Sequence, residues 1–198
     1  MFQLTDQLRL AQLDRGVIRL ATDIDDMTVS EFLDEFAYVL AQPAVAAITL
    51  EIMCPGGDGY AAFAAYDTII ASPKPVQGVV LGYAASAAAM IILQACKPRM
   101  AYPSARFLIH EIQEVRFGMS KLSSTEDNTR ELTAVQDKIL EVLSSRTGKS
   151  REAIKLAIER REYWLGAKEA LEFGLIDSIY QGLEPASGQL EFTWNIRS

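Results

Sequence analysis

Short apolar runs alternate with segments of helical spacing along most of this chain, and this alternation restricts the folds that it can adopt. Helical spacing predicts helices over 28–42 and 58–71, and Pro43 ends the first of them. Apolar runs predict strands over the ranges 17–20, 46–52, 76–81, 99–102 and 107–109. Because the connections are short and most runs lack strict alternation, we predict an α/β fold whose largely parallel sheet is covered on both faces.

The second half of the chain is predicted to be richer in helices. A long helix at 121–147 has a polar surface and one narrow apolar stripe, so it could project from the body or pack on another subunit. Further helices are predicted at about 150–160 and 167–173, and further strands at 175–180 and 190–196. We predict one main domain over 1–181, with a projecting region at about 112–147, and a C-terminal extension over 182–198 that carries a strand.

Composition and charge narrow the class of protein. The net charge of −7 is opposite to that expected of a protein that binds nucleic acid through its phosphates. The uncharged stretch 78–96 contains Ser86 and Gln94, and we predict a buried strand followed by a buried helix there, not a membrane span. The first residues lack the pattern of a secretory signal. We therefore expect a cytoplasmic protein without nucleic-acid or membrane partners.

The cysteines argue against a metal site. Cys54 and Cys96 are the two cysteines of the chain; they form no Cys-x-x-Cys pair, and one histidine alone is present. This set is too small for a typical zinc site, so we predict no metal. We expect both thiols to be buried and inert, as in a reducing compartment.

Ser86 and His110 are the main candidates for chemistry. Ser86 lies in a run of small residues at the predicted start of a helix over about 86–95, where the positive end of the helix dipole stabilises negative charge. His110 ends an apolar run and is the sole histidine. A nucleophile, a base and the backbone donors of a Gly56-Gly57 turn are the groups that acyl transfer requires.

Each of these residues also has an ordinary structural explanation. Ser86 could simply cap a helix. His110 could be a hydrogen-bonded side chain at a sheet edge, and the glycines could form a tight turn. The residues by themselves leave both explanations open.

Several motifs follow one another in a characteristic order. They are Pro55-Gly56-Gly57, Ala65-Tyr66-Asp67-Thr68-Ile69, Gly82-x-Ala84-Ala85-Ser86, Leu108-Ile109-His110 and Glu169-Ala170-Leu171-Glu172-Phe173-Gly174-Leu175-Ile176-Asp177. This order resembles that of the Clp protease proteolytic subunit family of serine peptidases, over about 16–180. The resemblance implies a spiral of β-β-α units, shared with the crotonase fold, in which the long helix from about Lys121 is a projecting handle.

The resemblance also implies roles for individual residues. They are Ser86 as nucleophile, His110 as general base, Gly57 and Ala87 as oxyanion donors, and Gly56, Glu114 and Arg116 as contacts of an extended peptide substrate. No metal or organic cofactor is implied. The family assembles into heptameric rings, and two rings stack into a tetradecamer that encloses the active sites. Peptides or unfolded chains are therefore the expected substrates, and an ATPase unfoldase is a possible partner.

The third catalytic position departs from the family pattern. The family has an aspartate in an Asp-Arg-Asp element before an aromatic residue, and the matching stretch here reads Arg160-Arg161-Glu162-Tyr163-Trp164. The resemblance therefore implies that Glu162 replaces the aspartate, because a glutamate can also orient a histidine. Alternatively, Glu162 is a surface carboxylate paired with a neighbouring arginine. Arg161 matches an arginine that joins the two rings, whereas Arg160 replaces its acidic neighbour.

Three functions are compatible with these patterns. The first is a serine endopeptidase that works inside a ring-shaped chamber. The second is a catalytically weak or inactive structural subunit of such a ring, suggested by Glu162 and Arg160. The third is a crotonase-type acyl-CoA enzyme, which would leave the pairing of Ser86 with His110 without an explanation.

Overall fold

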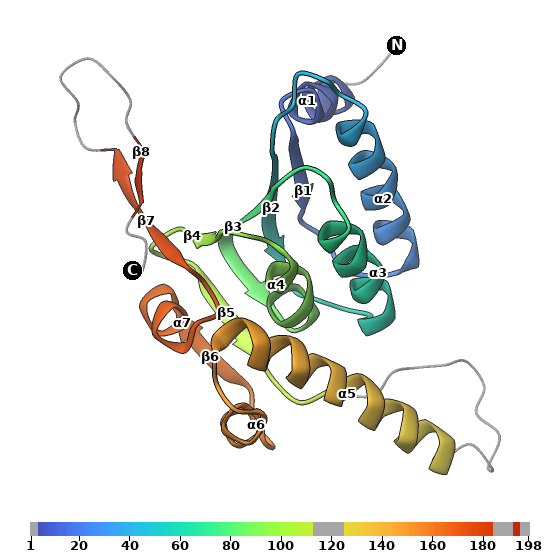
Figure 1. Cartoon of the computed structure of the whole chain (residues 1–198), viewed down its shortest axis with the longest axis vertical. Coiled ribbons are helices and arrows are strands. Elements are labelled where there is room, and N and C mark those ends of the chain that lie inside the picture. The colour runs from blue at the N-terminus through green and yellow to red at the C-terminus, as the bar shows by residue number, and fades with distance from the viewer. Residues whose placement is uncertain (1–3, 113–124, 184–191, 195–198) are drawn as a thin grey trace.

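The computed structural model describes residues 4–112, 125–183 and 192–194 and shows one mixed sheet with helices packed against it (Figure 1). The strands are β1 Val17–Leu20, β2 Ile48–Cys54, β3 Val76–Ala85, β4 Arg99–Ala101, β5 Arg106–Ile109, β6 Tyr163–Gly166, β7 Ser178–Leu183 and β8 Phe192–Trp194. Within these residues the sheet order is β1-β2-β3-β4-β7-β8, and β5 pairs with both β3 and β6. Pairing is parallel except for β5 with β6 and β7 with β8.

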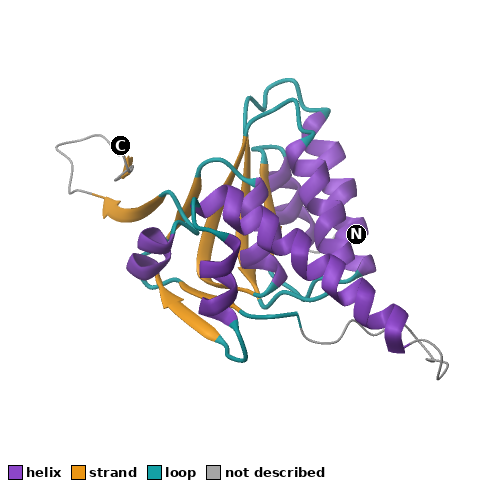
Figure 2. Cartoon of the chain, turned by 60° about the horizontal axis from the view of Figure 1, so that its bottom comes forward, coloured by secondary structure: helices purple, strands orange, loops and turns teal. Residues whose placement is uncertain are grey.

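Most of the helices gather on one side of the strands, and one short helix lies apart from them near the opposite edge (Figure 2). They are α1 Leu4–Leu13, α2 Asp26–Leu40, α3 Gly59–Ile70, the π-helical turn η1 Ala88–Ile92, α4 Leu93–Ala95, α5 Thr125–Thr147, α6 Arg151–Ile158 and α7 Ala167–Phe173. The far end of α5 extends away from the rest of the molecule (Figure 1). In the described part of the chain, no helix is both long enough and apolar enough to cross a membrane.

Side-chain caps fix where the two helices next to the sheet begin. Asp25 caps α2 by accepting from the N–H of Thr28, whose hydroxyl accepts in turn from the Asp25 N–H. Asp58 caps α3 by accepting from the N–H of Ala61 at 2.8 Å. The apolar stripe of α2, with Phe36 at 1 % exposure, packs into the core. The cap at Asp58 matters for function because it fixes the chain just after the Gly56-Gly57 turn.

A buried polar cluster joins β4 to the segment that precedes β7. Arg99 is 4 % exposed and its guanidinium donates to both carboxylate oxygens of Asp177, at 2.6 and 3.2 Å. Arg99 also donates to the side-chain oxygen of Gln94 and to the carbonyl of Arg146. Arg146 in turn donates to the carbonyl of Cys96 at 2.6 Å. This Arg99–Asp177 cluster therefore connects the last turn of α5 to the sheet.

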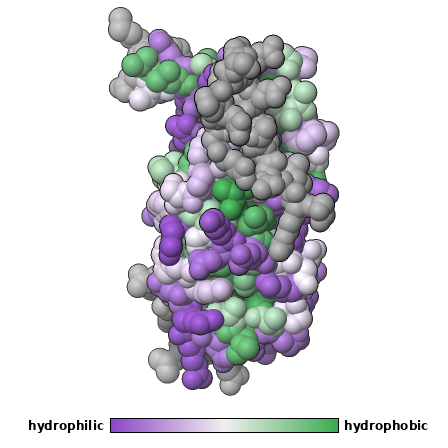
Figure 3. Space-filling view, turned by 90° about the vertical axis from the view of Figure 1, so that its left-hand side faces the viewer, coloured by the Kyte–Doolittle hydropathy of each residue, from purple (hydrophilic) through white to green (hydrophobic). Residues whose placement is uncertain are grey.

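The face of the sheet away from α2 and α3 carries polar pairs as well as apolar side chains. Arg19 donates to Glu51 at 2.7 Å, and Gln77 donates to Thr49 at 2.7 Å, so neighbouring strands are linked by side chains. Met53 is 45 % exposed on β2. Figure 3 views the molecule from this side and shows hydrophobic side chains interspersed with hydrophilic ones.

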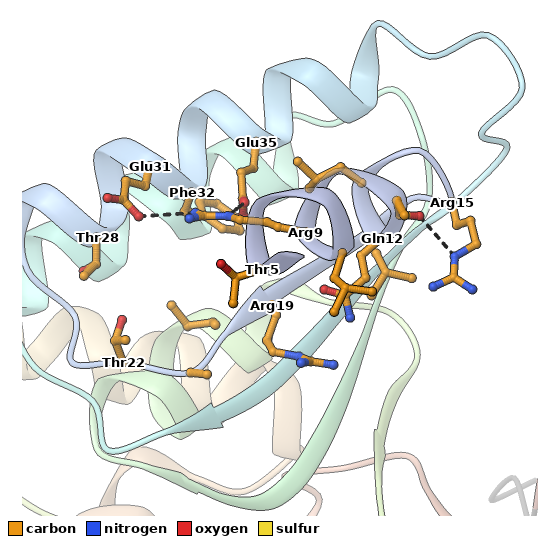
Figure 4. A pocket seen from close by; sticks show the side chains of 16 residues that line it. Thr5, Arg9, Gln12, Arg15, Arg19, Thr22, Thr28, Glu31, Phe32 and Glu35 are labelled. Carbon is orange, nitrogen blue, oxygen red and sulfur yellow. Dashed lines mark hydrogen bonds and ion pairs between the residues drawn. The ribbon is translucent and has the colours of Figure 1, made fainter. Parts of the chain in front are cut away.

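A cavity of about 520 Å³ lies between α1, β1 and α2 (Figure 4). Arg9 of α1 points across it and donates to Glu31 at 3.2 Å and to Glu35, both on α2. Arg19 lines the same cavity from β1. Arg9, Glu31 and Glu35 are thus engaged with one another and hold α1 against α2, whereas Arg19 is paired with Glu51.

The α/β fold with a largely parallel sheet is confirmed, but the prediction that both faces of the sheet are covered is wrong for β1 and β2, whose other face carries polar pairs and the exposed Met53. The strand predicted at 76–81 is too short. β3 continues through Gly82 to Ala85, and Gly82 adopts a φ of +71° within the strand. The strand predicted at 175–180 begins later, at Ser178. The sequence patterns also missed α1 and β6. The C-terminal strand is present as β8 at Phe192–Trp194, and the domain boundary at about 181 stays a prediction.

Candidate active site

Ser86 occupies a tight turn between β3 and the following helix. Its φ is +53°, a left-handed backbone conformation that residues other than glycine seldom adopt. The turn is held from both sides, because the Ser86 N–H donates to Leu108 at 2.9 Å and the Ser86 carbonyl accepts from Ala89 and Met90. Such backbone conformations cost about 1–3 kcal/mol and are concentrated at functional sites.

His110 lies beside Ser86 because β3 and β5 are parallel neighbours. Ala85, the last residue of β3, is in register with Leu108, and His110 follows directly after β5 ends at Ile109. The carboxyl ends of both strands thus meet at one edge of the sheet. The His110 Nε2 atom lies 2.8 Å from the Ser86 Oγ atom, within hydrogen-bond distance.

The other ring nitrogen of His110 contacts the main chain. Nδ1 is within hydrogen-bond distance of the carbonyl oxygen of Glu111, the next residue. A carbonyl can only accept, so Nδ1 is the protonated nitrogen in this contact. Nε2 is then free of a proton and accepts from the Ser86 hydroxyl, which is the arrangement that a general base requires.

A cavity of about 580 Å³ opens over this pair. Its wall is largely apolar, with polar groups concentrated near the serine, as is common in ligand sites. The lining residues are Pro55, Gly57, Asp58, Gly59, Ser86, Ala87, Met90, Ile91, Leu108, His110, Ile112, Val135, Ile139 and Glu162. The cavity therefore brings together five residues that the sequence analysis assigned to the site, which are Ser86, His110, Gly57, Ala87 and Glu162, whereas Gly56 does not line it.

The Gly56-Gly57 turn needs two glycines. Gly56 has a φ of +95°, and an added Cβ would come within 2.7 Å of the Ser86 Cβ. Gly57 has a φ of +146°, and its added Cβ would clash with the Ile24 carbonyl. The bridge to Ile24 uses the Gly56 carbonyl and the Asp58 N–H, so the N–H of Gly57 takes no part in it. Among the described residues, neither this N–H nor that of Ala87, at the start of a helix, has a hydrogen-bond partner, and such donors can bind a negatively charged oxygen.

The thiol of Cys54 stabilises this turn. It donates to the carbonyl of Thr22 at 3.0 Å and accepts from the N–H of Gly56 at 3.3 Å. Burial raises the pKa of the Cys54 thiol to about 11, so it stays protonated near neutral pH. The thiol is therefore a structural group, in agreement with the inert cysteine expected from the sequence.

Glu162 lies across from His110 but is not bonded to it. β6 runs antiparallel to β5 with Tyr163 opposite Ile109, so the next pair along is His110 with Glu162. In the described part of the chain, the carboxylate of Glu162 accepts from the Trp164 indole N–H at 3.4 Å and makes no hydrogen bond to His110. Arg161 donates instead to the carbonyl of Ala157, so it is not the partner of Glu162 there.

Two predicted substrate contacts cannot be placed. Glu114 and Arg116 lie outside the described residues. Conversely, the sequence patterns missed Glu111 and Trp164, which touch His110 and Glu162. The adjacency of Glu111 to the sole histidine was a signal, but a backbone carbonyl leaves no mark in a residue pattern. Among the described residues, no group of three or more histidine, cysteine or acidic side chains could hold a metal ion.

A serine hydroxyl within hydrogen-bond distance of an imidazole, beside a cavity lined by backbone of a glycine turn and a helix start, is typical of serine hydrolases. Comparison with known proteins specifies the family. The model of the Clp protease family matches residues 4–182, so the chain belongs to the Clp protease family, as the motif order predicted.

Curated relatives bear the same family name. The ATP-dependent Clp protease proteolytic subunit of Porphyromonas gingivalis is 32 % identical over 183 residues, covering 88 % of this chain and 81 % of the relative. Subunit 1 of Chlamydia muridarum is also 32 % identical, over 90 % of this chain and 93 % of the relative. Subunit 1 of Tropheryma whipplei is 34 % identical over 82 % of this chain and 79 % of the relative.

Proposed function

We propose that this chain is a serine endopeptidase in which Ser86 is the nucleophile and His110 the general base. The observation that carries the proposal is the 2.8 Å contact between Ser86 Oγ and His110 Nε2 in the cavity. Ser86 Oγ attacks the peptide carbonyl carbon while Nε2 takes its proton. The tetrahedral intermediate collapses as Nε2 gives that proton to the leaving amine, and an acyl-enzyme remains. Water then attacks the ester by the same route, which frees the acid and restores Ser86.

The N–H groups of Gly57 and Ala87 would stabilise the oxyanion. Gly57 lies in the turn between β2 and α3, Ala87 directly follows Ser86, and both residues line the cavity. Donors that are already in place when charge develops lower the barrier more than donors that must reorganise. We extend the proposal to the peptide itself, whose backbone would contact Gly56 and, along the segment after His110, Glu114 and Arg116.

Glu162 is proposed as the third member of the site. It lies directly before β6, one step beyond the Tyr163–Ile109 pair and thus across from His110, and it lines the same cavity. Its carboxylate would have to leave the Trp164 indole in order to accept from Nδ1. In that position it would stabilise the imidazolium that forms during attack.

The assembly and partners follow from the family. We propose a heptameric or tetradecameric ring that encloses the sites, acts on peptides or unfolded chains, and needs no cofactor. The relatives are named as ATP-dependent, which supports an ATPase unfoldase as partner. A cytoplasmic location fits this proposal. Native mass spectrometry tests the ring, and a monomer would contradict it.

Labelling with a fluorophosphonate tests the proposed chemistry directly. We expect the probe to modify Ser86 of the folded chain, and His110→Ala to abolish the modification. Ser104→Ala changes a serine in the turn before β5, outside the cavity lining, and serves as the matched control that retains labelling. Folded protein that stays unmodified after long incubation would contradict the peptidase proposal.

A structural, catalytically weak subunit is the second candidate. The contact of Glu162 with Trp164 in place of His110 favours it. A chain that assembles into a ring with an active relative, and that resists the probe in that ring, would establish this role. The family match favours either of these two functions over an acyl-CoA enzyme.

A further inference from the structure

We propose that Glu111 is a positioning residue for His110, acting through both its backbone and its side chain. This inference rests on the proposed peptidase function. It goes beyond that function because it assigns the orientation of the base to the residue next to it, in addition to Glu162. Three described contacts carry it, and they involve His110, Arg160 and Gln136.

The first contact sets the proton position on His110. The Glu111 carbonyl accepts from Nδ1–H, which leaves Nε2 to accept from Ser86 at 2.8 Å. In the described structure Glu162 is bonded to Trp164, so the Glu111 carbonyl is the group that selects this tautomer. A histidine in the other tautomer would present a proton to the serine and could not act as its base.

The second contact fixes the peptide that carries this carbonyl. The side chain of Glu111 accepts from the N–H of Arg160 at 3.0 Å. Arg160 has a φ of +54°, the left-handed region that an arginine adopts only when its surroundings impose it. Glu111 thus ties the residue after the base to the loop that leads into Glu162 and β6.

The third contact extends the support to α5. The N–H of Ile112 donates to the side-chain oxygen of Gln136 at 2.8 Å. The Glu111 carbonyl and the Ile112 N–H belong to the same peptide group. This group is held by α5 through its N–H and by the loop at Arg160 through the Glu111 side chain, so its carbonyl stays directed at the imidazole. Orientation of this kind is worth much in rate, since misplacement by about 1 Å can cost up to about a hundredfold.

The sole histidine makes the proposal measurable without any assay of activity. With ¹⁵N-labelled histidine, the chain gives one Nδ1 and one Nε2 signal, whose shifts report the tautomer. We expect the Nδ1–H form in the unmodified chain and a mixture of both tautomers in Glu111→Ala. Glu111→Gln should keep the Nδ1–H form, because its amide oxygen can still accept from Arg160. Glu159→Ala removes a nearby exposed carboxylate and serves as the matched control.

Kinetics with a peptide substrate separate positioning from general stability. We expect Glu111→Ala to lower kcat about tenfold to a hundredfold with KM within about twofold, and Glu111→Gln to stay within about threefold of the unmodified chain. A pure Nδ1–H signal in Glu111→Ala, or equal effects of alanine and glutamine, would overturn the proposal. If the fluorophosphonate fails to label the unmodified chain, the peptidase function fails, and the histidine signals still decide the role of Glu111.

Discussion

The Arg99–Asp177 cluster and the Ser86–His110 pair both join distant segments through polar groups, yet they are built for different purposes. In the cluster, Asp177 receives three hydrogen bonds from Arg99, which itself is almost fully buried. Around Ser86, Gly57 and Ala87 line an open cavity, and the carboxylate of Glu162 is turned toward an indole. The polar groups of Arg99 and Asp177 are thus engaged with one another, whereas the groups around Ser86 border a cavity.

The first way to test this contrast is to remove the base. We expect His110→Ala to lower peptide turnover on the order of a hundred-thousandfold or more, because members of such a catalytic set act as a unit. Unfolding by urea should change little, since His110 is half-buried and makes no ion pair in the described structure. A variant that loses most of its folding stability would show that the pair also has a structural task.

The second test removes the acidic member of the cluster. Asp177→Ala leaves the buried Arg99 without its main partner, and we expect a loss of about 2–4 kcal/mol in the free energy of unfolding. This loss of stability is smaller than that expected for a fully buried ion pair, because the Asp177 side chain is 34 % exposed. Urea denaturation followed by circular dichroism measures it.

Glu51→Ala is the matched control for that change. Glu51 pairs with the half-exposed Arg19 on the outer face of the sheet. Exposed pairs contribute about 0–1 kcal/mol, so this variant should be far milder. Equal losses in the two variants would remove the distinction between the cluster and the surface.

The third test concerns Glu162. We expect Glu162→Ala to lower turnover about tenfold to a hundredfold, less than removal of the base, because the Glu111 carbonyl still holds Nδ1. Peptide turnover measured beside Glu172→Ala, an acidic residue of α7 outside the cavity, checks the effect. Unchanged turnover would mean that the site works with Ser86 and His110 alone.

The fourth and smallest effect is a dependence of stability on pH. Burial acts to raise the pKa of Asp177, but hydrogen bonds from Arg99 outweigh it and hold the pKa below the usual carboxyl value. Ionised Asp177 therefore stabilises the fold above the pKa of an unfolded aspartate, about 3.9, and this contribution is lost as pH falls through the lower folded value. Asp177→Asn should show a flatter loss of stability between pH 5 and about 3. Parallel curves would contradict the assignment to Asp177.

Features that follow from the order of residues could be predicted from the sequence, whereas contacts made by the folded backbone could not. The order of motifs placed Ser86, His110 and Gly57 at one site, because parallel strands bring their carboxyl ends together. Gly82 misled the strand prediction, since a positive φ inside a strand looks like a turn in a residue pattern. β6 follows the charged residues Arg160-Arg161-Glu162 and ends in a glycine, so its four residues stand out less than the apolar runs of β1 and β5. The partners of Nδ1 and of Glu162 could not be predicted, because one is a backbone carbonyl and the other is an indole two residues away.

The left-handed backbone at Ser86 has a consequence for how such a subunit can change over time. A glycine at position 86 would relieve the conformation that the serine tolerates. The proposed nucleophile therefore occupies a position at which backbone stability and cleavage oppose each other. A single exchange there would remove the hydroxyl and the backbone strain together.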